Sequence, residues 1–444
     1  MSTVAAIDGT HQSGVAMEAL AAARLAALAP RPTTLAATGL SAELLGDLAS
    51  KLLLRAGVLS LSALVERLAV AGNILAEVLA VLRREARVEV RPGGEQELSY
   101  ALTERGRYLA LDALQRDGYV GPAPVRLEDY SRLVLAQTVH RRCINRETMQ
   151  ATLSGLVVSD VLCDRLGAAL NSGRAIFLHG VPGTGKTYVA RRLGRAFSGE
   201  VLVPRALLVN GLTIRLLDPA VHEDIELLGT ASPFLLNAGF DPRYACCERP
   251  IVHVGGEVDL AMLEVERREA TRELYAPLQL KANNGLLIID DLGRQRVSAE
   301  QILNRWIVPM EERIDHLSIG GGAHFTVPFD VVLVFSTNLE PRRLADEALL
   351  RRLGHKIRFE PIPAETYRTI WQRTCASLQL QFDPELVEFV VTELHGKHGV
   401  ELLPCHPRDL LNMALDRVRY EGSELLLSRE LLSWAWNNYF LQSR

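Results

Sequence analysis

The residues with the clearest chemical potential form a glycine-rich run at 180–187 that reads G-V-P-G-T-G-K-T. The run matches the pattern G-x-x-x-x-G-K-[ST] at every fixed position, and a short apolar segment at 175–179 precedes it. Glycines allow main-chain amides to wrap around phosphate oxygens, the lysine can reach the outer phosphates, and the threonine hydroxyl can bind Mg²⁺. We therefore predict a strand, a phosphate-binding loop and a helix, with nucleotide contacts from Gly180, Val181, Pro182, Gly183, Thr184, Gly185, Lys186, Thr187 and Tyr188.

Two carboxylates follow a second apolar run. Residues 285–289 read Gly-Leu-Leu-Ile-Ile, which is typical of a central parallel strand, and Asp290 and Asp291 come next. Beside a phosphate loop, the first carboxylate can hold Mg²⁺ through water, and the second can orient or deprotonate the attacking water. The alternative is a strand that simply ends in polar residues. We predict Thr187 and Asp290 as metal ligands and Asp291 as a catalytic residue.

A third apolar run at 331–335 ends in Ser-Thr-Asn. With this element, the chain from about residue 159 to the C-terminus resembles the AAA+ ATPase family. The resemblance implies an α/β fold: a P-loop NTPase core at 159–360, with a parallel sheet between helices, and an all-α lid at 361–444. It also implies that Asn338 stands at the sensor 1 position, where a polar side chain contacts the γ-phosphate region.

The same resemblance implies that arginines act on the nucleotide. Residues 346–353 resemble the helix end that presents an arginine finger to a neighbouring subunit, so Arg352 is the first candidate and Arg351 the second. Either arginine could instead cap its own helix. Arg408, within the His-Pro-Arg sequence at 406–408, matches the sensor 2 pattern. A finger acting in trans implies a homo-oligomeric ring, and a hexamer is the expected count.

Two features depart from the usual pattern of that family. The strand-end pair is Asp-Asp where Asp-Glu is usual, which is compatible with slow turnover and does not imply an inactive site. The span between Lys186 and Asp290 is longer than a compact core needs. We predict an insertion at 200–284, with strands at 201–210 and 249–254 and a charged helix or loop at 264–273. It either contacts a substrate or partner or is a decorated surface.

Residues 311–327 form two alternating segments around three glycines, which predicts a β-hairpin. It resembles the pre-sensor 1 hairpin of the AAA+ branch that contains magnesium chelatase and MoxR-type chaperones. His316, Ile319 and His324 could line the pore of a ring, or they could lie on the hairpin surface. The sequence at 278–296 also resembles bacterial proteins described as predicted ATPases with chaperone activity.

The N-terminal part of the chain divides into three segments. The alanine-rich residues 1–33 predict a flexible tail. Helical periodicity at 41–54, 60–68 and 73–85, followed by a strand pair at 87–91 and 98–102 and a helix from Thr103, is the order of a winged helix-turn-helix domain, assigned to 34–118. Asn73 is predicted to cap the third helix. The glycines and prolines at 118–125 predict a linker, with helices at 127–141 and 159–170 beyond it and the linker region ending at 158.

The third helix of that domain is the one that often reads DNA in winged-helix proteins. Here it is dominated by apolar residues and carries Glu77, so its polar face is thin. Protein docking or oligomerisation is therefore favoured over DNA binding, which stays an alternative.

Composition sets outer bounds on these predictions. The 444 residues carry a formal net charge of −4, which provides no general attraction to nucleic acid or an anionic membrane. Cys246 and Cys247, with His253 downstream, are interpreted as buried thiols rather than metal ligands because neighbouring side chains in an extended segment diverge. No apolar run reaches the ~20 residues of a membrane helix and no signal peptide is evident, so a cytoplasmic location is expected.

These features together predict an ATP hydrolase that uses ATP and Mg²⁺ to remodel or assemble a protein partner, as a chaperone does. The competing hypothesis is a DNA-directed ATPase, such as a loader, transposition helper or regulator, that binds DNA through the winged helix.

Overall fold

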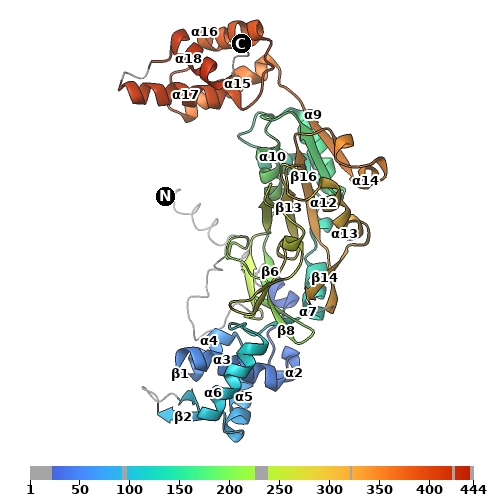
Figure 1. Cartoon of the computed structure of the whole chain (residues 1–444), viewed down its shortest axis with the longest axis vertical. Coiled ribbons are helices and arrows are strands. Elements are labelled where there is room, and N and C mark those ends of the chain that lie inside the picture. The colour runs from blue at the N-terminus through green and yellow to red at the C-terminus, as the bar shows by residue number, and fades with distance from the viewer. Residues whose placement is uncertain (1–22, 93–97, 226–238, 321–322, 423–425, 441–444) are drawn as a thin grey trace, which may run out of the picture.

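A five-stranded parallel sheet lies at the centre of the chain, which is known here from a computed structural model that describes residues 23–92, 98–225, 239–320, 323–422 and 426–440 (Figure 1). Its strand order is β10-β13-β16-β5-β17, and every neighbouring pair is parallel. The strands are β5 (Ile176–Gly180), β10 (Ile251–Val254), β13 (Gly285–Ile289), β16 (Val331–Thr337) and β17 (His355–Phe359).

The apolar runs of these strands are continuous because helices cover both faces of the sheet. Alternate residues point to opposite faces: Leu286 and Ile288 pack into one apolar cluster, whereas Leu287 and Ile289 pack into the other. The first cluster includes residues of α9 (Asp160–Asn171), α10 (Lys186–Leu193) and the short helices α8 (Arg146–Thr152), η2 (Val139–Arg141) and η3 (Gly194–Ala196). The second includes residues of α12 (Ala299–Arg305), α13 (Ile307–Glu312), α14 (Glu347–Arg352) and η4 (Ala261–Leu263). Between β16 and α14 lies η5 (Pro341–Arg343).

A second β-rich unit is inserted before and after β10. Its five-stranded sheet has the order β11-β12-β8-β7-β4, and a separate pair, β6 with β9, lies beside it. The strands are β4 (Val125–Arg126), β6 (Val201–Pro204), β7 (Ala206–Val209), β8 (Leu212–Arg215), β9 (Tyr244–Cys247), β11 (Glu266–Arg268) and β12 (Glu273–Tyr275). Helix α11 (Leu278–Lys281) then leads into β13.

Three predictions about this insertion need correction. The segment at 264–273, predicted as a charged helix or loop, belongs to the β11–β12 hairpin, whose turn uses the positive φ of Arg272. The predicted strand at 201–210 is split into β6 and β7, which belong to different sheets. The strand predicted at 249–254 is β10, which pairs with β13 in the central sheet rather than with the insertion.

The hairpin predicted at 311–327 is present as β14 (Ile314–Gly320) and β15 (Ala323–Pro328), which pair in antiparallel register. Leu317, Ile319 and Phe325 pack into the apolar cluster of the insertion sheet. Ile319 is therefore buried, in neither of the two positions considered for it, a ring pore or the hairpin surface. His316 and His324 are exposed on the opposite face of the hairpin.

The N-terminal domain contains the elements predicted for it, in the predicted order. The predicted elements are α3 (Ala42–Ala56), α4 (Leu61–Leu68), α5 (Gly72–Arg84), β2 (Val88–Pro92), β3 (Leu98–Leu102) and α6 (Glu104–Arg116). The structure adds α2 (Leu35–Thr38) and β1 (Val58–Ser60), which were not predicted, and the sheet has the order β1-β3-β2. Ser41, Ser60 and Thr103 cap α3, α4 and α6 through their hydroxyls. Asn73 does not cap α5, because its side-chain amide donates a hydrogen bond to the carbonyl of Thr33 instead.

The segment predicted as a linker is built into the fold. Tyr119, Ala123 and Val125 are buried, and β4 pairs with β7 of the insertion sheet before α7 (Leu127–Ala136) begins. Part of the segment predicted as a flexible tail is also packed: Leu25 and Ala29 belong to the same apolar cluster as Phe240, and residues 1–22 lie outside the described residues. The composition of both segments is typical of loops, but their apolar side chains are packed into the fold.

A buried ion pair joins the N-terminal domain to the insertion. The Arg243 guanidinium bonds both carboxylate oxygens of Asp241, and its Nη1 donates to the carbonyls of Thr38 and Pro124, each at 3.1 Å. The two charged side chains are only 5% and 3% exposed. This one side chain therefore ties the N-terminal domain, the segment before β4 and the insertion together.

The C-terminal domain contains helices and no strand among its described residues and lies at one end of the elongated molecule (Figure 1). Its elements are α15 (Ala364–Ser377), α16 (Pro384–Glu388), the π-helical segment η6 (Phe389–Gly396), α17 (His406–Glu421) and α18 (Arg429–Tyr439). Tyr367, Trp371 and Trp436 are buried in its core. None of the helices in the described part of the chain combines the length and apolarity needed to cross a membrane.

We predict that Arg243→Ala lowers the free energy of unfolding by about 3–5 kcal/mol, because it leaves the Asp241 carboxylate buried without its partner. Urea unfolding of the full chain measures the loss. Arg91→Ala, which removes an exposed ion pair with Glu89, is the matched control and should cost less than about 1 kcal/mol. Equal losses for the two variants would contradict the role given to Arg243.

Candidate active site

The glycine-rich loop connects β5 to α10, as the sequence predicts. Gly183 and Gly185 have φ angles of 83° and 88°, in the left-handed region that glycine tolerates without strain. Lys186 Nζ lies inside the loop and donates to the carbonyls of Gly180 and Val181, at 2.8 Å each. Thr184 is buried, and its hydroxyl bonds the Val181 carbonyl. The loop therefore curls around an ammonium group.

The environment of Lys186 is partly apolar and partly acidic. Burial lowers the pKa of its ammonium, whereas Asp290 and Asp291 act in the opposite direction. Because Lys186 interacts electrostatically with both aspartates, the structure brings the loop and the end of β13 together as predicted. Val181 within the loop and Tyr188 directly after it are 41% and 52% exposed, and the Arg192 guanidinium lies 5.6 Å from the centre of the Tyr188 ring.

Asp290 is held by polar groups from three other elements. Burial acts to raise the pKa of its carboxyl, but hydrogen bonds from His253, Thr187 and Ser336 outweigh that effect and hold the pKa well below its ordinary value. The carboxylate is therefore ionised at neutral pH. It lies beside the Thr187 hydroxyl, so the two predicted metal ligands are adjacent, and an ionised carboxylate next to a hydroxyl is a donor set that suits Mg²⁺.

Asp291 and Asn338 are in direct contact. Asn338 Nδ2 donates to Asp291 Oδ1 at 3.0 Å, which links the ends of β13 and β16. The backbone of Asp291 has a φ of 50°, a left-handed conformation that aspartate adopts more readily than most residues. The two predicted catalytic side chains therefore lie at one edge of the sheet, where the carboxyl ends of adjacent parallel strands meet.

His253 also lies at this site, a position that the sequence analysis did not predict. Its Nε2 lies 3.4 Å from Asp290 Oδ2, and Arg191 Nη2 lies 3.1 Å from its Nδ1. Because a guanidinium can only donate, Nδ1 accepts and Nε2 carries the proton that faces Asp290. The sequence shows His253 as a polar residue near the end of an apolar segment. It does not show that this segment pairs with the strand that ends at Asp290.

Cys246 and Cys247 take no part in this site. Both are buried on β9, which pairs with β6, and burial raises the pKa of each thiol to about 12. Their interpretation as buried thiols fits these surroundings.

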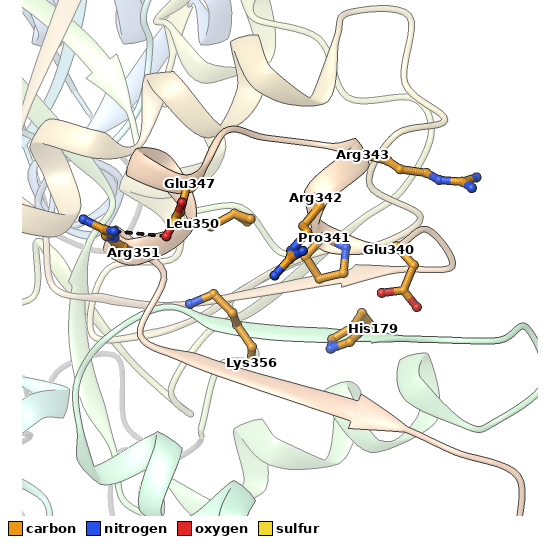
Figure 2. A pocket seen from close by; sticks show the side chains of 9 residues that line it. All are labelled: His179, Glu340, Pro341, Arg342, Arg343, Glu347, Leu350, Arg351 and Lys356. Atoms are coloured by element: carbon orange, nitrogen blue, oxygen red, sulfur yellow. Dashed lines mark hydrogen bonds and ion pairs between the residues drawn. The ribbon is translucent and has the colours of Figure 1, made fainter.

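The two arginine-finger candidates lie at the end of α14. Arg351 is paired with Glu347 one helical turn earlier, at 3.0 Å, on the wall of a cavity of about 530 Å³ (Figure 2). His179 and Lys356 line the same cavity. Arg352 bonds Glu311 on α13 at 2.7 Å. Both arginines are engaged by carboxylates of other residues rather than by the phosphate loop of their own chain.

Arg408 lies near the start of α17, on a surface that approaches the phosphate loop. A Cβ added to Gly183 would come within 2.6 Å of Cys405 Sγ, which shows how closely the loop and the segment before α17 are packed. The Arg408 side chain is exposed. The structure therefore brings the segment that contains Arg408 to the site but gives its side chain no partner among the described hydrogen bonds.

Comparisons with known proteins match parts of this architecture. A family model described as a domain of unknown function (DUF8689) matches residues 363–438, in the C-terminal helical domain. The search of curated proteins finds no match.

Solved structures match the chain at low similarity. Thermotoga maritima RuvB, titled a Holliday junction branch migration motor, has 13% identity and a TM-score of 0.36, covering 63% of this chain and 68% of that chain. Brucella abortus NtrX in complex with ATP has 15% identity and a TM-score of 0.40, covering 75% and 64%. With TM-scores below 0.5, the assignment of function depends on the geometry of this chain itself.

Proposed function

We propose that the chain is an AAA+ ATPase that couples ATP hydrolysis to the remodelling or assembly of a protein partner. The observation that carries this proposal is the meeting of the phosphate loop, Asp290, Asp291 and Asn338 at one edge of a parallel sheet. A loop of amides with a central lysine suits a polyphosphate, and an ionised carboxylate beside a hydroxyl suits Mg²⁺. Bound there, Mg²⁺ would neutralise charge on the phosphates.

The residues of the site divide the work of hydrolysis. Lys186 and the loop amides hold the phosphates, and Thr187 and Asp290 would hold the metal. Asp291 Oδ1 already accepts a hydrogen bond from Asn338, so Oδ2 remains to orient water and take its proton. Asn338 thereby fixes the direction of that carboxylate. Val181 and Tyr188 provide an exposed apolar surface beside the loop that suits the base of the nucleotide.

The site also requires parts from outside the central sheet. We propose that the C-terminal domain is the lid, because its Cys405 packs against Gly183 of the phosphate loop. Arg408 follows three residues later, so it would reach the phosphates of a bound nucleotide. Arg352 acts on the nucleotide of a neighbouring chain, because its own chain engages it away from the loop, through Glu311. Head-to-tail interfaces of this type close into a ring, for which six subunits are expected.

The N-terminal elements follow the order of a winged helix-turn-helix domain, and we propose that it docks a protein partner. The exposed face of α5 carries Ala76, Glu77 and Ala80 along its first turns, and its cations, Arg83 and Arg84, lie only in the last turn. The start of such a helix usually contacts the bases, and here it has no cation for phosphate contacts. Because Arg243 fastens this domain to the insertion, a bound partner would be connected firmly to the ATPase core. Duplex DNA that stimulates turnover would instead favour a DNA-directed ATPase.

We expect Lys186→Ala to abolish measurable ATP binding, because it removes the cation at the centre of the loop. Isothermal titration calorimetry with Mg²⁺-ATP tests this, and Lys397→Ala, which alters an exposed lysine in the C-terminal domain, is the control. ATP binding by Lys186→Ala at parental affinity would contradict the assignment of the site.

Asp291→Asn should retain ATP affinity but lose hydrolysis by about 10²- to 10⁴-fold, since an amide cannot take a proton from water. Steady-state phosphate release and nucleotide binding are measured on the same preparation. Parental turnover in the variant would remove Asp291 from the catalytic residues.

Arg352→Ala should bind ATP normally and hydrolyse it about 10³-fold more slowly, if the arginine acts as a finger. Mixing this variant with Lys186→Ala should recover part of the activity, because the second chain supplies an intact finger to the loaded site of the first. No recovery at any mixing ratio, with subunit exchange verified by fluorescence, would exclude a site shared between chains.

A further inference from the structure

Glu311 and Arg352 form a contact between two helices on the same face of the central sheet. Arg352 is the last residue of α14, and Glu311 is near the end of α13; the distance from Arg352 Nε to Glu311 Oε1 is 2.7 Å. Both side chains are about half exposed, at 41% and 52%. They line a cavity of about 480 Å³ together with Arg174, Arg313 and Arg351.

The contact with Glu311 uses the Nε of Arg352 and leaves its two terminal nitrogens available for another partner. A guanidinium has five N–H donors, and only the Nε donor faces Glu311. Among the described residues, no hydrogen bond involves the two terminal nitrogens of Arg352. These are the nitrogens that can bind phosphate oxygens in a bidentate fork. Arg351 differs, because its terminal Nη2 is already bonded to Glu347.

We propose that Glu311 is a positioning residue for Arg352: it holds the guanidinium by Nε so that both terminal nitrogens point outward to the nucleotide of a neighbouring chain. This inference rests on the proposed function of Arg352 as a finger. Without Glu311, a long side chain at the end of an exposed helix samples many rotamers, and the fraction with the fork correctly presented falls. The contact also gives Arg352, rather than Arg351, the geometry of the finger.

Loss of the Glu311 side chain should lower activity without lowering stability. An ion pair this exposed contributes little to folding, so its loss should leave the chain folded. The nucleotide loop of the same chain is untouched, so KM for ATP should not change. The effect should appear in kcat alone.

The test compares Glu311→Ala, Glu311→Gln and Glu312→Ala in the full-length chain. Glu311→Ala should lower kcat by about 10- to 100-fold with KM for ATP unchanged, as misplacement of a catalytic group does. Glu311→Gln should restore much of the loss, because its amide oxygen can still accept from Nε. Glu312→Ala is the matched control, because Glu312 is exposed on the same helix and has no described partner; it should behave as the parent.

Mixing experiments identify the site on which Glu311 acts. Glu311→Ala mixed with Lys186→Ala should regain activity, because the second chain supplies a correctly held finger. Glu311→Ala mixed with Arg352→Ala should gain nothing beyond the sum of the two, since both chains are defective on the same face.

The outcomes distinguish this inference from the proposed function. If Arg352→Ala is impaired and Glu311→Ala keeps parental kcat, the inference is overturned and the finger stands. If Glu311→Ala is impaired but is not recovered by Lys186→Ala, Glu311 acts on its own chain and the inference is again overturned. If Arg352→Ala keeps parental kcat, the finger itself is wrong.

Discussion

The parallel alignment of β13, β16 and β5 is the constraint on which the site depends. Because these strands are parallel neighbours, the residues that follow them emerge at a single edge of the sheet. The groups that meet there, Asp290, Asn338 and the phosphate loop, are far apart in the sequence. Each one follows a buried apolar strand rather than lying within it. The same edge receives His253 from β10, so four of the five strands contribute to one centre.

The opposite edge of the sheet is fixed by a buried polar network. Asp330, just before β16, accepts hydrogen bonds from the backbone of Val139 and the side chain of Asn284, at 2.8 and 2.6 Å. Arg249 donates to the carbonyls of Asn284 and Gln137, at 2.7 and 3.0 Å. The starts of the strands that carry the site aspartates and asparagine are thus bonded to the segment after α7 and to the insertion. A buried network of this kind resists independent movement of its parts.

The local chemistry of the site was readable from the sequence, whereas much of the surrounding assembly was not. Residue type beside an apolar run predicts each of its parts: the loop at 180–187, the aspartates after β13 and Asn338. The sequence of a strand does not show which strand it pairs with. Here β4 pairs with β7, and β8 pairs with β12, across long stretches of chain. For this reason the segment at 118–125 resembled a linker and the strand at 249–254 was assigned to the insertion. His253 and Glu311 were not predicted because their contacts, with Asp290 and with Arg352, join segments that are distant in the sequence.

In the proposed mechanism a neighbouring chain completes the site, so hydrolysis should depend on assembly. The most direct measurement is the ATP turnover rate per chain across a range of protein concentrations, with the mass of the assembly measured in parallel by analytical ultracentrifugation. Our account predicts little turnover where the chain is monomeric and a rise in the rate per chain that follows the appearance of the ring. A rate per chain that is the same for monomers and for assemblies would contradict it.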